Sequence, residues 1–148
     1  MKIIPLCILL SVSVVTAAET QPAKTEAPAK AMEIVHVDAA QAKKLLDASS
    51  TKPAAKEAQI TVIDVRTPEE YAAARLGGAK LIDIGSDTFA ADVAKLDRKQ
   101  TYLVHCAAGG RSTKALETFK KLGFKKVIHL DGGINAWKKA GFPVESGK

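Results

Sequence analysis

Cys106 lies in a short stretch whose residue types suit the stabilisation of a negative charge. The stretch reads Cys106-Ala107-Ala108-Gly109-Gly110-Arg111-Ser112. Small side chains and two glycines let the backbone curl, so that successive N–H groups point at the sulfur atom. Together with the positive end of a following helix, such a nest lowers the pKa of a thiol. The sequence therefore predicts that Cys106 is a thiolate nucleophile at neutral pH.

A structural interpretation of Cys106 competes with this one. A cysteine at a strand end can be an inert small hydrophobe, and the glycines can merely shape a turn. Here the thiol, the glycine pair, Arg111 and an expected helix start fall within seven residues. That coincidence favours the functional interpretation.

The elements that must position this stretch are short apolar runs that alternate with amphipathic segments. The runs cover residues 34–37, 60–65, 80–84, 102–105 and 127–130. They are typical of buried parallel strands, and their alternation with helices predicts an α/β fold with a central parallel sheet of about five strands and helices on both faces. Ligand sites of open parallel sheets lie beyond the carboxyl ends of the strands, where the fourth run leads into Cys106.

Helix boundaries are marked by capping residues. Asp38 with Gln41, and Thr67 with Glu70, form capping-box patterns, and a proline follows Thr67 at the first helical position. Two further helices are expected over residues 112–122 and 133–140, each followed by a glycine suited to a left-handed C-terminal cap. Residues 48–58 are expected to form an exposed loop.

The first residues differ from the rest of the chain. Lys2 precedes an apolar run over residues 3–15 and three small residues, which is the layout of a secretory signal. The run is shorter than the roughly 20 residues that span a bilayer. We therefore expect a signal peptide over residues 1–18, a flexible linker over 19–31 and one domain over 32–148, in a periplasmic or secreted protein without stable membrane insertion after cleavage.

Cysteine content and charge exclude some classes of protein. Cleavage would remove Cys7 and leave Cys106 alone, so the fold cannot rely on an internal disulfide. The 22 basic and 16 acidic residues give a net charge of +6, but the lysines are scattered and form no stripe with aromatic residues. Binding to nucleic acid is therefore not expected.

Three separated motifs resemble the rhodanese-like, or thiosulfate sulfurtransferase, single-domain family. They are C-x-x-G-x-R-S at residues 106–112, the stretch 62–71, and the stretch 130–137 with Gly-Phe-Pro at 141–143. The similarity covers residues 32–145, with the motifs in the same order as in the family. The resemblance implies the rhodanese-like version of the α/β fold.

The resemblance also implies a chemistry. Cys106 would take a sulfane sulfur from a small donor such as thiosulfate, hold it as a persulfide, and pass it to a thiol or cyanide acceptor, without a cofactor. A redox protein is a further candidate partner. The backbone amides of Ala107, Ala108, Gly109, Gly110, Arg111 and Ser112 would form the sulfur cradle. The oligomeric state is left open.

The resemblance leaves the roles of three charged residues open. Arg111 would either contact the oxyanion of a substrate or brace the loop, because a guanidinium suits both. Asp64 and Arg66 would either order the loop or have a helix-capping or surface role. Two departures also matter: Arg75 stands where the family usually has a histidine, and no cation precedes Arg111 in the loop, which leaves the donor open.

Two other functions compete on the same fold. Phosphatases and arsenate reductases related to rhodaneses use a C-x5-R loop, whereas this chain has C-x4-R between Cys106 and Arg111. The smaller ring favours one sulfur atom over a tetrahedral oxyanion. The second alternative is a non-catalytic module that binds a partner or senses redox state; such modules commonly lack the cysteine.

Metal binding is not predicted from the spacing of the candidate ligands. His36, His105, His129 and Cys106 form no pair with the spacing of ligands on a helix or in a knuckle. We expect the strand histidines to be satisfied by hydrogen bonds, and His105 to face away from Cys106 across its strand.

Overall fold

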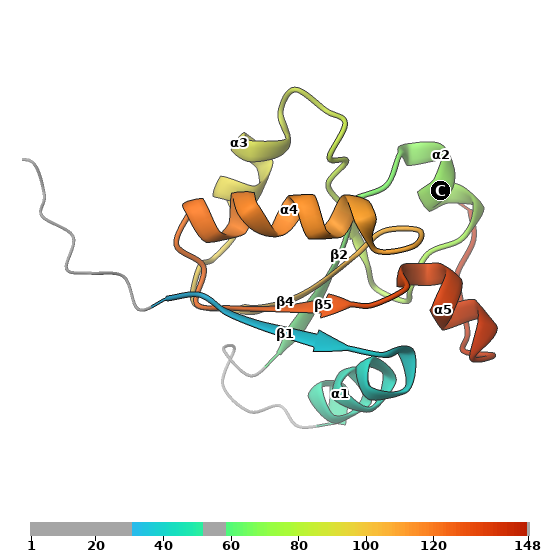
Figure 1. Ribbon diagram of the computed structural model, residues 1–148. Helices are drawn as coiled ribbons and strands as arrows, with labels where there is room; N and C mark the ends of the chain where they lie inside the picture. The colour runs from blue at the N-terminus through green and yellow to red at the C-terminus, as the bar shows by residue number, and fades with distance from the viewer. Residues whose placement is uncertain (1–30, 52–58, 148) are drawn as a thin grey trace, which may run out of the picture.

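The chain folds around one parallel sheet with strand order β1-β5-β4-β2-β3, as seen in the computed structural model, which describes residues 31–51 and 59–147 (Figure 1). The strands are β1 (Glu33–Val37), β2 (Ile60–Asp64), β3 (Lys80–Leu81), β4 (Thr101–His105) and β5 (Lys126–Leu130). The helices are α1 (Ala39–Thr51), α2 (Pro68–Ala73), α3 (Phe89–Ala94), α4 (Gly110–Lys121) and α5 (Gly133–Lys139). The predicted α/β class with five parallel strands is confirmed.

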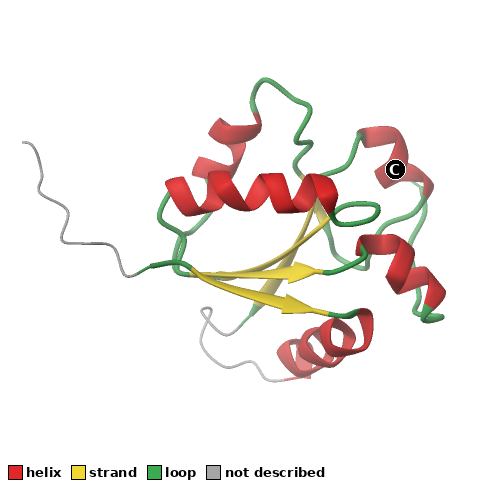
Figure 2. Ribbon diagram, in the orientation of Figure 1, coloured by secondary structure: helices red, strands yellow, loops and turns green. Residues whose placement is uncertain are grey.

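Helices cover both faces of the sheet, as predicted (Figures 1 and 2). Helices α3 and α4 pack on one face, where their buried side chains meet alternate residues of β2, β4 and β5. Helices α1 and α5 pack on the other face. Because side chains of a strand alternate between the faces, Leu103 and Val104 belong to different clusters.

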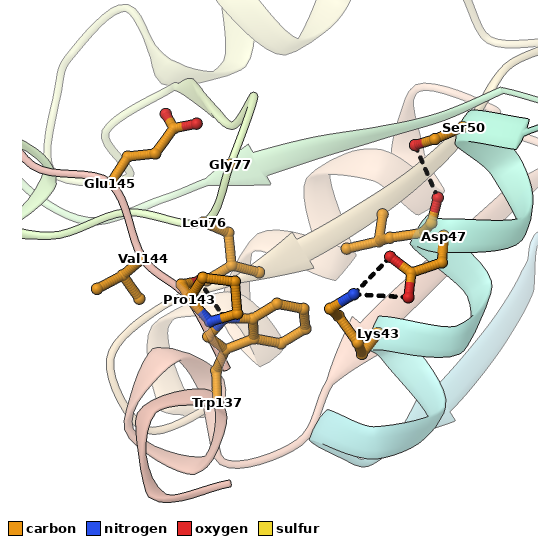
Figure 3. A pocket seen from close by; sticks show the side chains of 10 residues that line it. Lys43, Asp47, Ser50, Leu76, Gly77, Trp137, Pro143, Val144 and Glu145 are labelled. Carbon is orange, nitrogen blue, oxygen red and sulfur yellow. Dashed lines mark hydrogen bonds and ion pairs between the residues drawn. The ribbon is translucent and has the colours of Figure 1, made fainter. Parts of the chain in front are cut away.

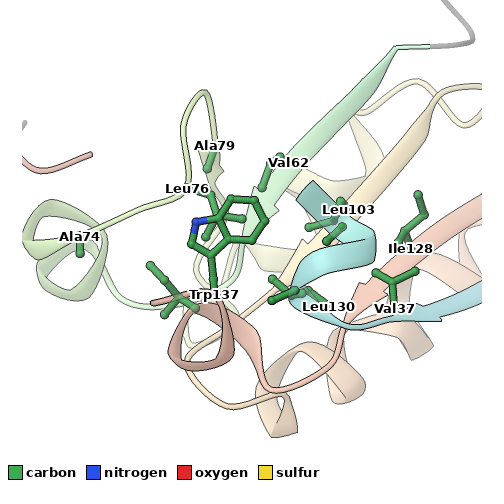
Figure 4. Close-up of a cluster of buried hydrophobic side chains, with 12 residues drawn as sticks. Val37, Val62, Ala74, Leu76, Ala79, Leu103, Ile128, Leu130 and Trp137 are labelled. Atoms are coloured by element: carbon green, nitrogen blue, oxygen red, sulfur yellow. The ribbon is translucent and has the colours of Figure 1, made fainter. Parts of the chain in front are cut away.

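Trp137 of α5 is the largest side chain in the cluster on the α1 side of the sheet (Figure 4). It is 3% exposed, and its indole Nε1–H donates to the carbonyl oxygen of Pro143 at 2.8 Å. Burial of an aromatic ring of this size stabilises the fold by roughly 2–3 kcal/mol. Trp137 therefore fixes α5 at the carboxyl edge of the sheet, where the predicted site lies.

Both capping boxes form. Gln41 N–H donates to Asp38 Oδ1 at 2.8 Å, and Asp38 N–H donates to Gln41 Oε1 at 3.1 Å. Thr67 and Glu70 make the equivalent reciprocal bonds at the start of α2. These contacts span three residues, which is why the sequence alone predicts them.

Two local predictions require correction, and one helix was not predicted. The loop expected over residues 48–58 begins later, because α1 continues to Thr51, and residues 52–58 lie outside the described part of the chain. The third strand has two residues instead of five, since it is an edge strand that pairs with β2 alone. Helix α3 was not predicted from the sequence. Its buried side chains, Phe89 and Val93, belong to the same apolar cluster as residues of α4.

The N-terminal predictions concern residues that precede the described part of the chain. The signal peptide over residues 1–18 and the linker to residue 30 lie outside the described residues. Within residues 31–51 and 59–147, no helix combines the length and hydropathy needed to cross a bilayer. The domain boundary at residue 32 remains a prediction.

Candidate functional site

Cys106 follows β4 directly, at the carboxyl edge of the sheet and at the start of the turn into α4. Its side chain is buried, with 2% of the residue exposed. Gly109 N–H donates to Cys106 Sγ at 3.1 Å, and the Ser112 hydroxyl lies 3.5 Å from the same atom. Gly109 has φ +106°, a value that L side chains rarely adopt, so glycine is needed for the amide to face inward.

The start of α5 holds the outer side of this loop. Ile134 N–H donates to the carbonyl oxygen of Cys106 at 2.9 Å, and Asn135 N–H donates to that of Ala107 at 3.0 Å. A Cβ atom on Gly133 would lie 2.3 Å from the Cys106 carbonyl oxygen, so only glycine permits this approach. Because a peptide unit is planar, fixing its carbonyl outward fixes the following N–H inward. Helix α5 thus orients amides of the cradle.

The environment lowers the pKa of the Cys106 thiol below its ordinary value. Burial raises this pKa, but hydrogen bonds from the Ser112 hydroxyl and from the backbone amides of Ser112, Gly109 and Ala108 outweigh burial and lower it. The direction matches the prediction of an acidic thiol. The hydroxyl of Ser112 is an addition to the predicted set of backbone donors.

Arg111 braces the loop in this structure. Its guanidinium makes two parallel bonds to Glu70 of α2, with Nη1 2.6 Å and Nη2 2.7 Å from the carboxylate oxygens. Hydrogen bonding to Arg111 lowers the pKa of Glu70 to about 2. Of the two roles left open for Arg111, the geometry shows bracing. Glu70 was missed as a site residue because the capping box already accounted for it.

Asp64 and Arg66 form a buried ion pair at the end of β2. Arg66 Nε lies 2.9 Å and 3.0 Å from the two carboxylate oxygens of Asp64, and Arg66 Nη2 donates to the carbonyl oxygen of Ala74 at 2.6 Å. Both side chains are at most 4% exposed. A surface role is therefore wrong, whereas Arg66 does bond the carbonyl of Ala74, the C-cap residue of α2. The pair holds the segment after α2; none of its hydrogen bonds reaches residues 106–112.

His105 faces Asp64 across β2 and β4, away from the sulfur, as predicted. Burial lowers the pKa of His105, although the nearby Asp64 carboxylate raises it. Its Nε2 lies 3.7 Å from Asp64 and has no hydrogen-bond partner in the described part of the chain. Burial therefore favours the neutral form of the His105 imidazole.

A second group of polar side chains touches the loop from β5. His129 Nε2 lies 2.8 Å from Ser112 Oγ, and His129 Nδ1 lies 2.8 Å from Asp131 Oδ1, which in turn lies 3.0 Å from His36 Nδ1. Spacing along the sequence did not predict this cluster, since His36 and His129 are 93 residues apart. The signal that could have found it is the matching position of each histidine within its predicted strand, because β1 and β5 pair in register at these two residues.

Arg75, which replaces the usual histidine, lies away from the sulfur. It forms an ion pair with Glu145 at 3.5 Å, hydrogen-bonds the Gly147 carbonyl, and its guanidinium lies 4.9 Å from the Tyr71 ring centroid. Its contacts tie the C-terminal segment to the end of α2. The substitution thus has a structural consequence without adding a charge to the loop.

A cleft between α1, Trp137 and the C-terminal segment is open to solvent (Figure 3). Its walls include Lys43, Leu46, Val144 and Glu145. No residue of the 106–112 loop lines it. The cleft is therefore separate from the loop around Cys106.

Comparison with known proteins gives consistent matches. The model of the Rhodanese-like domain matches residues 38–140. Thiosulfate sulfurtransferase 18 of Arabidopsis thaliana is 31% identical over 129 residues, covering 79% of this chain and 88% of the plant protein. The probable adenylyltransferase/sulfurtransferase MoeZ of Mycobacterium tuberculosis is 40% identical over 81 residues, which are 55% of this chain and 21% of MoeZ. The matched region thus spans about a fifth of MoeZ.

A solved structure agrees with the fold. The crystal structure of a rhodanese-like domain protein from Staphylococcus aureus superimposes with a TM-score of 0.60 at 27% identity, covering 79% of this chain and all of the other.

Proposed function

Because the chain belongs to the rhodanese-like domain family, we propose that it is a sulfurtransferase that carries a sulfane sulfur as a persulfide on Cys106. The observation that carries the proposal is the convergence of the Gly109 amide and the Ser112 hydroxyl on Cys106 Sγ within a C-x4-R loop. These hydrogen-bond donors stabilise the Cys106 thiolate, which attacks the sulfur-donating substrate. They also suit the terminal sulfur of a persulfide, which is anionic near neutral pH.

In the first half-reaction the Cys106 thiolate attacks the sulfane sulfur of a donor such as thiosulfate. A new S–S bond forms, the S–S bond of thiosulfate breaks, and sulfite leaves with the electron pair. The loop amides and Ser112 stabilise the negative charge before and after the transfer without having to reorganise. Arg111 and Glu70 keep the loop in place during this step.

In the second half-reaction a thiol or cyanide attacks the outer sulfur of the persulfide. The S–S bond of the persulfide breaks, the electron pair returns to Cys106 Sγ, and the product is a new persulfide or thiocyanate. Cys106 is almost fully buried, so both reactants must be small or present a thin terminal group. A protein thiol on an extended segment fits the same requirement.

The dimensions of the loop disfavour phosphate or arsenate chemistry. A loop with four residues between cysteine and arginine brings the amides close to one atom, whereas a tetrahedral oxyanion needs donors about 3 Å from several oxygens. Arg111 is also engaged on both sides of its guanidinium fork by Glu70. We propose a sulfur atom as the ligand of this loop.

The test is to incubate the purified protein with thiosulfate and follow intact mass and thiocyanate formation with cyanide. Mass gain by one sulfur atom and thiocyanate production, both lost in Cys106→Ser, would support the proposal, because a hydroxyl cannot carry sulfane sulfur. A thiol that is acidic but neither gains sulfur nor turns over would favour a binding or redox-sensing module. Hydrolysis of aryl phosphates by the unmodified protein would favour a phosphatase over a sulfurtransferase.

We also propose export to the periplasm or the exterior, from the pattern of residues 1–18. N-terminal sequencing of the native protein is expected to find a start near Ala18 or Glu19. A soluble form in the cytoplasm that retains Met1 would contradict this.

A further inference from the structure

Three side chains with metal-ligating atoms meet at the carboxyl edge of the sheet. His36 comes from β1, His129 comes from β5 at the paired register position, and Asp131 follows β5 directly. His36 Nδ1 and His129 Nδ1 are 3.3 Å apart, and both lie within 3.0 Å of Asp131 Oδ1. All three atoms therefore face one small volume.

We propose that His36, His129 and Asp131 bind a divalent transition-metal ion through these three atoms. Ligand bonds to zinc are about 2.0–2.1 Å long, and tetrahedral coordination places neighbouring ligand atoms about 3.3–3.4 Å apart. Of the observed separations, 3.3 Å between the two Nδ1 atoms matches this value, and 3.0 and 2.8 Å to Asp131 Oδ1 are shorter by about 0.3–0.5 Å. A point about 2.1 Å from each atom lies roughly 1 Å above their plane. Binding thus needs only small side-chain adjustments.

The donor atoms select the class of metal. Two imidazole nitrogens suit zinc and its first-row neighbours, whereas magnesium and calcium prefer all-oxygen sites. Three protein ligands on one side of the ion leave at least one position for water or a small ligand. The His36 and Asp131 side chains are 56% and 54% exposed, so an ion can enter from solvent, while His129 is 4% exposed and anchors the site.

A second observation points the same way. A metal-ligating histidine normally donates its other ring N–H to a neighbouring acceptor, which fixes the ring. With Nδ1 on the metal, neutral His129 carries its proton on Nε2, 2.8 Å from Ser112 Oγ. Ser112 Oγ accepts that bond, and its single hydroxyl proton is shared between the carbonyl oxygen of Gly109 at 2.8 Å and Cys106 Sγ at 3.5 Å. Each short contact then has one donor and one acceptor.

This arrangement joins the metal site to the cysteine loop. Ser112 is the residue that contacts both His129 Nε2 and Cys106 Sγ. An ion on His129 would orient its ring and, through it, the hydroxyl that lies beside the sulfur. Zinc binding by these three side chains does not require a sulfur on Cys106, and sulfur transfer does not require the ion. Either proposal can therefore fail without the other.

The experiment measures Zn²⁺ binding by calorimetry on the untagged chain with Cys7→Ser and Cys106→Ser, because free thiols also bind zinc. We expect one ion per chain. His36→Ala and Asp131→Asn, both at exposed side chains, should each weaken affinity by at least about tenfold. Zn²⁺ should raise the melting temperature of the parent chain and have little effect on these variants.

Glu33→Gln is the matched control. Glu33 is an exposed carboxylate on β1 that pairs with Lys126 of β5, the same two strands that carry the histidines. Its removal should leave the zinc affinity unchanged, and Mg²⁺ should not compete. Absence of zinc binding, or equal affinity in the parent chain and the His36→Ala and Asp131→Asn variants, would show that the cluster is a hydrogen-bond network around Asp131 and overturn the proposal.

Discussion

The ends of β2 and β4 are neighbours in the sheet but differ in how their buried polar groups are paired. At the end of β2, Asp64 and Arg66 are buried. They form hydrogen bonds with each other, and Arg66 also bonds the carbonyl of Ala74. After β4, Cys106 is equally buried, yet the donors around it converge on a single sulfur atom. At the end of β2, the charge of Asp64 is balanced by Arg66. After β4, the hydrogen-bond donors around Cys106 are positioned to stabilise a negative charge on the sulfur.

This difference explains why burial has opposite meanings at the two ends. A buried ion pair contributes little net stability relative to an apolar pair, but removing one partner leaves an uncompensated charge. A buried thiol with inward amides gains reactivity, since hydrogen bonds outweigh the effect of burial on its pKa. The bond between Arg111, after β4, and Glu70, after β2, links the two ends.

The largest expected effect lies at the β2 end. Arg66→Met leaves Asp64 buried without its partner and should lower the free energy of unfolding by about 3–5 kcal/mol, measured by urea denaturation. Lys43→Met removes a partner from the exposed Lys43–Asp47 pair and should cost less than about 0.5 kcal/mol. Similar losses in the two variants would show that the buried pair is not special.

The next effect concerns the backbone that orients the cysteine loop. Gly133→Ala should lower stability by about 2–3 kcal/mol and reduce sulfur transfer more than tenfold, because the added Cβ meets the Cys106 carbonyl. Gly123→Ala has a similar positive φ with nothing within 4 Å, and should cost about 1–2 kcal/mol without changing transfer. Equal transfer by the two folded variants would rule out a role for α5 in shaping the loop.

A smaller effect is expected from one hydroxyl. Ser112→Ala should raise the pKa of Cys106 and slow its alkylation at pH 7 by about three- to tenfold, which corresponds to one hydrogen bond worth about 0.7–1.4 kcal/mol. Thr113→Val removes a hydroxyl that also bonds the Gly109 carbonyl but does not reach the sulfur. If both variants alkylate like the wild type, the backbone amides alone set the thiol pKa.

The smallest effect concerns the link between the ends. The pKa of Glu70 falls from an ordinary 4.5 to about 2 because Arg111 binds the charged form. The pair therefore stabilises the fold above about pH 4.5, and this contribution disappears as the pH falls towards 2. Both side chains are about one-third exposed, so at pH 7 the contribution should be below about 1 kcal/mol.

Glu70→Gln measures this link, because glutamine preserves the capping box with Thr67 and removes the charge. Its stability should differ from that of wild type at pH 7 and converge with it near pH 2, as measured by urea denaturation across that range. A difference independent of pH would mean that the carboxylate charge is not what stabilises the contact.

The local part of the site could be predicted from the sequence because its determinants lie within a few residues. Cys106, Gly109 and Ser112 lie within seven residues, in the turn after β4 and the first turn of α4, and the capping boxes span three residues each. The strands were visible as apolar runs. The length of β3 and the existence of α3 were not, since both depend on what packs against the edge of the sheet.

Only the tertiary structure determines the contacts between residues that are distant in the sequence. Arg111 meets Glu70 across 41 positions, and His36 meets His129 across 93. The strand order β1-β5-β4-β2-β3 brings the ends of β1, β5, β4 and β2 together at one edge. Residue types along the chain specify each strand and turn, whereas the identity of neighbouring strands depends on how all the apolar faces are buried at once.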